Sequence, residues 1–200
     1  MVLGYHAIFG TYGFWLPNDP RGSWSKFVGM YELHRRFGPA TKTTERHSVA
    51  HRVHDNSDRL AAKELLPRPP VVFDGLQARA VGHGLRESFR RGRVTVLCAI
   101  MPDHIHVVFR RHRQPAELIV NFMKGAATRA LVAENLHPYL SDRNDQGQVP
   151  LCWAQGEWVV YLDSADDIDR AIRYVEQNPP KGGLPPQSGS FVTPFSQESV

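Results

Sequence analysis

The chain has 200 residues, a length that suits one domain with a large insertion, or one domain with an appendage. Hydrophobic residues make up 42% of it, which is enough for a real core. Its net charge of +4 is too modest to indicate a nucleic-acid partner by itself. No apolar run is long enough to span a membrane, no secretory signal is visible, and two cysteines favour a reducing compartment. We therefore expect a cytoplasmic protein with no membrane partner.

The sequence pattern up to residue 90 predicts a strand, an insertion and a helix. Residues 3–13 are rich in aromatic and β-branched residues, as strands are. An insertion at about 20–70 is punctuated by Pro and Gly and is polar in its middle, with one or two short helices, for example at 61–66. Apolar residues at helical spacing then predict a helix over 74–90, with Asp74 as its N-cap.

The second part of the chain predicts two strands joined by a tight turn, a helix, a strand and a last helix. These segments lie at 94–100, 104–110, 115–135, 151–162 and 163–178. The third of these strands is interrupted by Gln155 and Gly156. Ser164 and Asp167 resemble a capping box at the start of the last helix, and Pro179 is expected to end it.

This order of elements predicts an α+β fold. We expect a ferredoxin-like or RRM-like antiparallel sheet with helices on one face, the hairpin of residues 94–110 at its centre, and a C-terminal helix. The domain would cover residues 1–184, and the Gly-, Pro- and Ser-rich residues 185–200 would form a loose tail. On this arrangement His104 and His106 would lie on the open face of the sheet.

The two histidines of the hairpin are separated by one residue. Because side chains alternate along a strand, His104 and His106 place two imidazoles on one face, which is half of a divalent-metal site. Histidine accounts for 10 of the 200 residues, so two half-exposed strand histidines that bind nothing are an equally simple interpretation.

The last helix carries a second pair of reactive side chains. Tyr174 and Asn178 are four residues apart, so both project from one side of the helix. A divalent metal would take His104, His106 and the Asn178 oxygen, and the Tyr174 hydroxyl would attack a phosphorus atom. Mg²⁺ or Mn²⁺ suits such mixed ligands, although imidazole also accepts Zn²⁺, Ni²⁺ or Co²⁺. Taken singly, Tyr174 could be an aromatic residue beside the apolar stripe and Asn178 a helix-end residue, and only their joint occurrence favours the reactive interpretation.

Two motifs resemble the HUH endonuclease superfamily, and within it the REP-associated branch of the single-tyrosine transposases. The first is His-Ile-His after a Pro-Asp turn, and the second is Tyr-Val-Glu-Gln-Asn-Pro-Pro-Lys-Gly-Gly-Leu at 174–184. Lys124-Gly125 and the stretch from Cys152-Trp153 to Trp158 are also in the style of this family. The resemblance covers about residues 72–184 and the opening strand.

The resemblance implies an enzyme that cleaves and rejoins single-stranded DNA of hairpin or palindromic repeat structure. Tyr174 would form a 5′-phosphotyrosine link, His104 and His106 would be metal ligands and Asn178 the third ligand, with Mg²⁺ or Mn²⁺ as the cofactor. The protein would be a monomer or a homodimer, and the insertion would recognise DNA structure or only enlarge the domain. The cations expected to contact DNA are Arg90, Arg91, Arg93, Arg110, Arg111, Lys124 and Arg173.

Two other classes of function stay open at this point. A sheet that carries aromatic and basic side chains also holds single strands without chemistry, so a non-catalytic nucleic-acid-binding module is the main alternative. A metal-dependent hydrolase of small phosphoesters is a third possibility. This possibility is weaker, because the chain has no carboxylate beside the two histidines other than Asp103.

Overall fold

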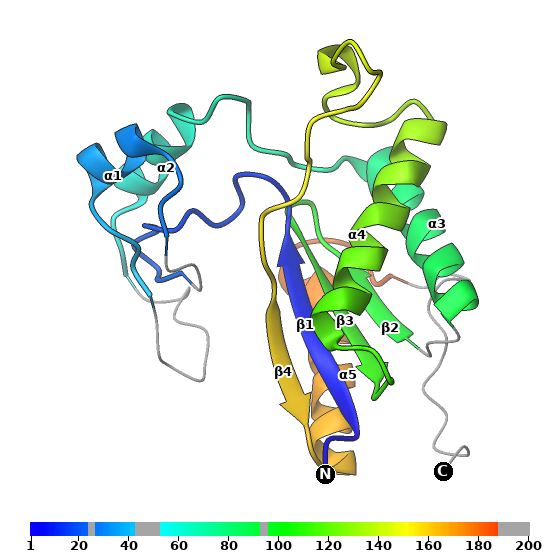
Figure 1. Ribbon diagram of the computed structural model, residues 1–200. Coiled ribbons are helices and arrows are strands. Elements are labelled where there is room, and N and C mark those ends of the chain that lie inside the picture. Colours follow the sequence, from blue (N-terminus) through cyan, green and yellow to red (C-terminus); the bar gives the residue numbers. More distant parts are fainter. Residues whose placement is uncertain (24–26, 43–52, 93–95, 188–200) are drawn as a thin grey trace.

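Four strands form one antiparallel sheet with helices on both of its faces (Figure 1). The structure is a computed structural model that describes residues 1–23, 27–42, 53–92 and 96–187. In spatial order the strands are β2 (Val96–Ile100), β3 (His104–Arg110), β1 (Gly4–Gly10) and β4 (Trp158–Leu162). The predicted α+β fold is confirmed. β3 and β1 occupy the centre of the sheet, and β2, the other strand of the predicted hairpin, lies at one edge.

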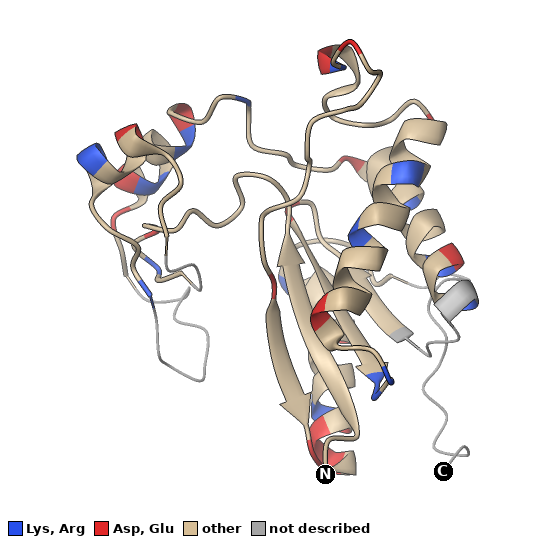
Figure 2. Ribbon diagram, in the orientation of Figure 1, with Lys and Arg blue, Asp and Glu red and all other residues tan. Residues whose placement is uncertain are grey.

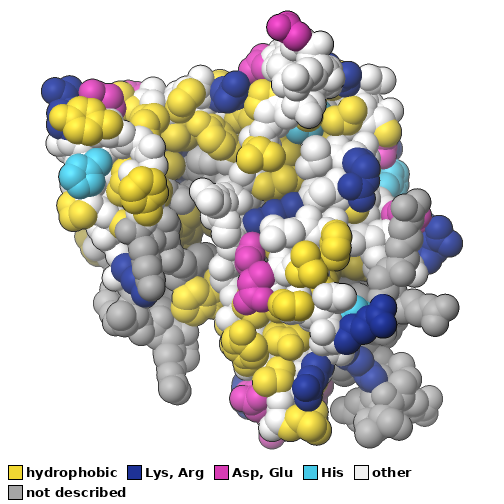
Figure 3. Space-filling view, viewed as in Figure 1, with side chains coloured by type: hydrophobic (Ala, Val, Ile, Leu, Met, Phe, Trp, Pro, Cys, Tyr) yellow, Lys and Arg dark blue, Asp and Glu magenta, His cyan; other side chains and the backbone are white. Residues whose placement is uncertain are grey.

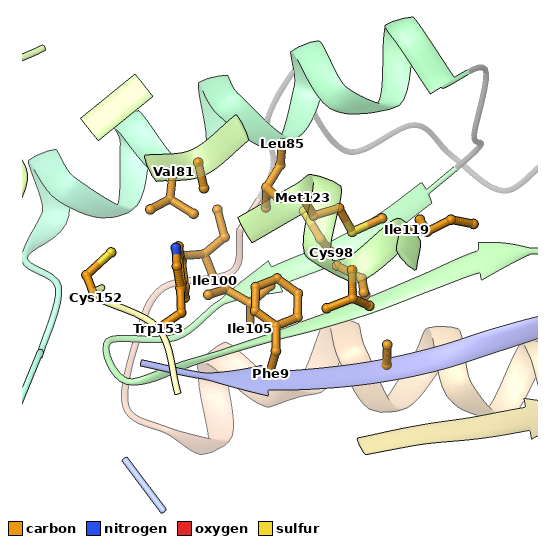
Figure 4. Close-up of a cluster of buried hydrophobic side chains, with 14 of the residues drawn as sticks. Phe9, Val81, Leu85, Cys98, Ile100, Ile105, Ile119, Met123, Cys152 and Trp153 are labelled. Carbon is orange, nitrogen blue, oxygen red and sulfur yellow. The ribbon is translucent and has the colours of Figure 1, made fainter. Parts of the chain in front are cut away.

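The main core lies between the sheet and two long helices, α3 (Gly75–Gly92) and α4 (Ala116–Ala133). Figure 4 shows Phe9 and Ile105 from the central strands beside Leu85 of α3 and Met123 of α4. The side chains that the strands contribute come from alternate positions, because successive residues of a strand point to opposite faces. One face of the sheet is therefore almost wholly apolar.

The opposite face of the sheet is covered by α5 (Ala165–Lys181), which lies behind the sheet in Figure 1. The expectation that this face is open, with helices on one side only, is wrong. The helix is amphipathic, and its apolar stripe packs on the apolar positions of β2 and β3. The buried residues of this second core are Leu97, Ala99, Val108, Leu162, Ile168, Ala171 and Val175. Burying this stripe stabilises the fold by roughly 25 cal/mol per Å² of apolar surface removed from water.

Both ends of α5 are fixed by hydrogen bonds. The Ser164–Asp167 capping box predicted for its start is present. The helix does not end at Pro179, however, but continues through Pro179 and Pro180 to Lys181. Prolines this late in a helix remove only hydrogen bonds of the last turn. The chain closes that turn with an N–H of Gly182 that lies 3.0 Å from the Asn178 carbonyl oxygen.

The insertion contributes two short helices, α1 (Tyr31–Phe37) and α2 (Asn56–Glu64), which lie beside the sheet in Figure 1. They surround a small apolar cluster of Leu16, Leu33 and Ala62. Leu16 belongs to the loop that follows β1, so this cluster ties the insertion to the end of a central strand. The second of the short helices was predicted at 61–66 and begins five residues earlier.

The rest of the described chain consists of loops and one 3-10 turn, Leu140–Asp142. Ahead of β4, Trp153 forms an isolated bridge with Thr11, so the predicted interruption of the last strand is present. Hydrophobic side chains also gather on the surface that Figure 3 shows. The exposed ones include Phe122 of α4 and Tyr161 of β4. Among the described helices, none is both long enough and apolar enough to cross a membrane.

Candidate active site

The two imidazoles of β3 lie on the same face of the sheet, as the spacing predicts. The His104 and His106 ring centroids are 4.9 Å apart, and the ring planes are inclined by 75°. His104, next to the Pro102–Asp103 turn, is partly exposed, whereas His106 is 3% exposed because α5 covers it. The pair therefore lies at the boundary between the sheet and α5 and not on an open surface.

Tyr174 and Asn178 of α5 both approach His106 of the same chain. The Asn178 Nδ2 atom lies 3.1 Å from His106 Nε2. The Tyr174 ring centroid lies 5.5 Å from that of His106, in an edge-to-face arrangement. Tyr174 is 44% exposed, so its phenol has a buried imidazole on one side and open access to solvent on the other. The four residues predicted for the reactive site are thus brought together within one chain.

A third histidine, His6 of β1, belongs to this cluster and was not predicted. Its Nε2 atom lies 3.1 Å from His106 Nδ1, and the two rings stack at 5.4 Å. The pairing of β1 with β3 places Ile8 opposite His106 and His6 opposite Val108, so all four side chains share one face. The alternation of Tyr5-His6-Ala7-Ile8-Phe9 contains this information, but only once the partner strand and the register are known.

His104 is held by two neighbours. Its Nδ1 atom lies 2.7 Å from the Asp103 carboxylate, and its ring stacks on Phe14 with the centroids 4.8 Å apart and the planes at 17°. Gly10 makes this stacking possible, because a Cβ atom at that position would lie 2.6 Å from the Phe14 ring. A carboxylate that binds the second nitrogen of an imidazole fixes its tautomer and its orientation.

The buried imidazoles are neutral. Burial is the main cause that lowers the pKa of His106 to about 2, because a charged ring there would lose its water, and the neighbouring imidazoles of His104 and His6 add to the effect. Burial alone lowers the pKa of His6 to about 4. Burial raises the pKa of Asp103, but the His104 hydrogen bond and the charges of His104 and Lys63 outweigh it, so this pKa lies below its usual value. The site therefore combines neutral nitrogen lone pairs with one anionic carboxylate at neutral pH.

Most of the cations predicted to contact DNA lie away from these imidazoles. Arg110 and Arg111 lie at the opposite end of β3, six or more residues from His104, which is about 20 Å along a strand. Figure 2 shows Lys and Arg residues beyond that end of the sheet. Arg90 is exposed and ion-paired with Glu87. The side chain of Arg91 and all of Arg93 lie outside the described residues.

Lys124 is buried, and its ammonium group is hydrogen-bonded within the fold. Its ammonium group donates to the Ala154 and Gly156 carbonyl oxygens and to the Glu157 carboxylate, the last at 3.1 Å. These contacts join α4 to the segment before β4 and use all three ammonium protons. Lys124 thus has the surroundings of a residue that stabilises the fold, and nothing in them leaves a proton for a phosphate group.

Three other cations lie close to the site. Arg173 is exposed on α5 next to Tyr174. The Lys181 ammonium lies 5.8 Å from the centroid of the Tyr174 ring. Lys63 of α2 is close enough for its charge to act on Asp103, and burial lowers its own pKa. Lys63 and Lys181 were not among the predicted cations. Lys181 follows Tyr174 by seven residues on the same helix, so helical spacing could have indicated it, whereas Lys63 belongs to the insertion.

The residues of the cluster fit a divalent cation. The Nε2 atom of His106 offers its lone pair toward Asn178, whose amide N–H occupies the place that an electrophile would take. Rotation of that amide would present its oxygen, and His104 would add a second imidazole. Within the described ranges no three His, Cys, Asp or Glu side chains converge as a metal site. A cation held here would have two imidazoles and one amide oxygen as ligands, with further positions left to water or a phosphate group.

No protein-family model and no curated protein matches the chain. The chain is similar to the solved structure of a REP-associated tyrosine transposase bound to a REP hairpin, at 13% sequence identity and a TM-score of 0.45. That similarity covers 98% of this chain and 91% of the other. The chain is also similar to a putative transposase from Deinococcus radiodurans, at 16% identity and a TM-score of 0.40, over 88% of this chain and 91% of the other.

Proposed function

We propose that this chain is a metal-dependent transposase that nicks and rejoins single-stranded DNA through a 5′-phosphotyrosine intermediate. The observation that supports it best is the meeting of Tyr174, Asn178 and the His104–His106 pair within one chain. These side chains come from two elements that are about 70 residues apart in the sequence. The apolar packing of α5 on the sheet does not require a phenol and an amide at this point, since both lie beside the apolar stripe.

The proposed chemistry is a transesterification. The Tyr174 oxygen forms a bond to the phosphorus while the bond between phosphorus and the 3′ oxygen breaks. The phenol proton leaves to solvent, and the departing 3′ oxygen takes up a proton, so no water is consumed and a free 3′-hydroxyl results. Attack by that hydroxyl, or by that of another strand, on the phosphotyrosine reverses the step and joins the DNA.

A phenol needs help to react at neutral pH. With an ordinary pKa near 10, only about one molecule in a thousand is ionised at pH 7. A divalent cation held by His104, His106 and Asn178 would polarise the scissile phosphate and stabilise charge that develops on its oxygens. Mg²⁺ and Mn²⁺ are the ions proposed. Lys181, beside the phenol ring, would contact a phosphate group that reacts there.

The substrate proposed is single-stranded DNA with hairpin or palindromic repeat structure, as the resemblance of the motifs implies. Arg173, Lys181 and Lys63 would contact phosphates near the site. Arg110 and Arg111 would contact a strand that extends along the sheet. Arg90 and Arg91 remain candidates for more distant phosphates, and Lys124 is left out because its protons are used within the fold.

Covalent capture tests this function directly. The protein is incubated with Mn²⁺ and a hairpin oligonucleotide that has single-stranded flanks, and a denaturing gel shows any protein–DNA adduct. We expect an adduct with the unaltered chain and with Tyr161→Phe, an exposed tyrosine on β4 that serves as the matched control. Tyr174→Phe should abolish the adduct while DNA binding persists, because only the reacting oxygen is lost.

Other outcomes separate the rival functions. An adduct formed by Tyr174→Phe would exclude Tyr174 as the nucleophile. DNA binding that depends on salt, with no adduct under any divalent ion, would favour a non-catalytic single-strand-binding module. Turnover of a chromogenic phosphodiester without a covalent intermediate would favour a hydrolase. His104→Ala should remove the adduct together with its dependence on Mn²⁺.

A further inference from the structure

His106 uses both of its ring nitrogens in hydrogen bonds. Its Nδ1 atom pairs with Nε2 of His6 and its Nε2 atom with Nδ2 of Asn178, each at 3.1 Å. A neutral imidazole has one N–H donor and one lone-pair acceptor. His106 must therefore donate one of these two hydrogen bonds and accept the other.

The amide of Asn178 decides the direction. An amide nitrogen carries only donors, so Asn178 donates and Nε2 of His106 accepts. The proton of His106 then resides on Nδ1, and the acceptor for it is Nε2 of His6. His6 in turn must carry its own proton on Nδ1. This chain of donors fixes the tautomers of two buried rings.

We propose that His6 is a positioning residue that holds His106 in its Nδ1–H tautomer, so that the Nε2 lone pair points toward Asn178. The inference rests on the proposed function in one respect, since that lone pair is the one a divalent cation would use. His6 contacts neither the scissile phosphate nor the cation in this arrangement. Its ring also lies 5.8 Å from the Tyr174 ring, in a tilted arrangement, but its hydrogen bond in the cluster is to His106.

The burial of the site explains why the acceptor for His106 is an imidazole, that of His6, and not a carboxylate. His104 is partly exposed, and its Nδ1 atom is bound by a carboxylate, Asp103. His6 and His106 are 8% and 3% exposed and lie between the sheet and α5. An ionised carboxylate in the place of His6 would have to lose its water there at a large cost in free energy, whereas a neutral imidazole accepts the same hydrogen bond without adding charge.

The tautomer can be measured before any metal or DNA is added. In ¹H–¹⁵N spectra at neutral pH, we expect His106 of the metal-free protein to show a pyrrole-type Nδ1 and a pyridine-type Nε2. Its signals are assigned by their absence from His106→Gln. His6→Leu should shift the population toward the Nε2–H form, in which His106 donates to the rotated Asn178 amide. His6→Gln, which keeps an acceptor at a similar reach, should retain the original pattern.

Mn²⁺ affinity gives a second readout, with free Mn²⁺ followed by electron paramagnetic resonance. We expect His6→Leu to weaken binding roughly 10- to 100-fold, as the loss of a partner of a metal ligand does, and His6→Gln to restore most of it. His34→Leu, which removes an exposed histidine of α1, should leave the affinity unchanged. This control corrects for the loss of one imidazole from the protein.

Three results would overturn the role of His6. They are an Nε2–H tautomer of His106 in the unaltered protein, an affinity for Mn²⁺ that His6→Leu does not change, and a loss with His6→Leu that His6→Gln does not repair. If His6→Leu fails to fold, the spectrum of the unaltered protein and of His6→Gln still decides the question. An expected tautomer in a protein that never forms a DNA adduct would leave this inference standing and refute the proposed function.

Discussion

Two histidines of the site, His6 and His106, are neutral because they are buried between the sheet and α5. In the unfolded chain both would regain an ordinary pKa near 6.5. The pKa in the folded state is lower, so below pH 6.5 the unfolded chain binds more protons than the folded one. The same burial that keeps the lone pairs available must therefore make the fold sensitive to acid.

We expect the free energy of unfolding of the metal-free protein to fall as the pH drops below 6.5. Each of the two histidines contributes a slope that approaches about 1.4 kcal/mol per pH unit below pH 6.5, which gives roughly 3 kcal/mol for both between pH 6.5 and 5. Urea denaturation at pH 7, 6 and 5 measures this loss. His6→Gln should remove about half of the slope, and an unchanged slope would show that His6 is not a neutral buried group.

The cation beside the nucleophile provides a second prediction for a single residue. Lys181→Met keeps the length of the side chain but removes its charge, so a phosphate that reacts at Tyr174 loses a nearby cation. At about 0.2–1 kcal/mol for an exposed ion pair, adduct formation should slow by up to about five-fold. Lys42→Met, on the exposed insertion, serves as a charge-matched control. A rate that both variants leave equal would remove Lys181 from the site.

The four reactive residues could be predicted from the sequence because each pair lies within one element. The spacing of His104 and His106 on a strand, and of Tyr174 and Asn178 on a helix, fixes which side chains share a face. His6 could not be found in this way. Its contact with His106 depends on the register of β1 against β3, across about 100 residues of chain, and a single sequence does not specify that register.

Among the elements, α5 departs most from its prediction. Its N-terminus was predicted from Ser164 and Asp167, since a capping box depends on neighbouring residues alone. Its C-terminus and its location were not. Its apolar stripe packs on β2 and β3, on the face that was expected to be open, and the helix continues past two prolines.

The crossing of α3 and α4 leads to a prediction about two glycines. A Cβ atom at Gly84 would lie 2.5 Å from the Ala126 carbonyl oxygen, whereas at Gly125 it would meet only the end of the Arg129 side chain at 3.4 Å. Gly84→Ala should therefore destabilise the protein by about 1–3 kcal/mol, despite the better helix propensity of Ala. Gly125→Ala should be neutral or stabilise it by up to about 1 kcal/mol.

Urea denaturation of both variants at one pH tests this contrast. The two substitutions add the same methyl group to facing helices, so the difference between them reports the closeness of the crossing and not helix propensity. Equal stabilities would mean that α3 and α4 pack further apart than described.

At the scale of the whole molecule, one chain contains all the residues of the proposed site. α5 follows β4 after only two residues, Asp163 and Ser164, and packs on the sheet of its own chain. The sequence alone does not decide whether the tyrosine helix completes its own site or that of a partner. The described chain places Tyr174 beside its own His106.

This arrangement predicts the result of a complementation experiment. Tyr174→Phe retains the histidines and His104→Ala retains the phenol, so a mixture of the two could regain activity only if the helix served a partner. We expect the mixture to form no more adduct than either variant alone, measured by covalent capture over a range of protein concentrations. Adduct formation that appears on mixing would show that helices are exchanged between subunits.

The short connection before α5 also bears on what happens to a severed strand. Under the proposed chemistry the 5′ end becomes part of a helix anchored by its apolar stripe, so its freedom of movement is that of a side chain and not of a mobile arm. The linked 5′ end would stay near the imidazoles until a 3′-hydroxyl attacks it. Resealing of the original strand would then compete with every transfer to a new one, and release of the freed 3′ segment would decide between them.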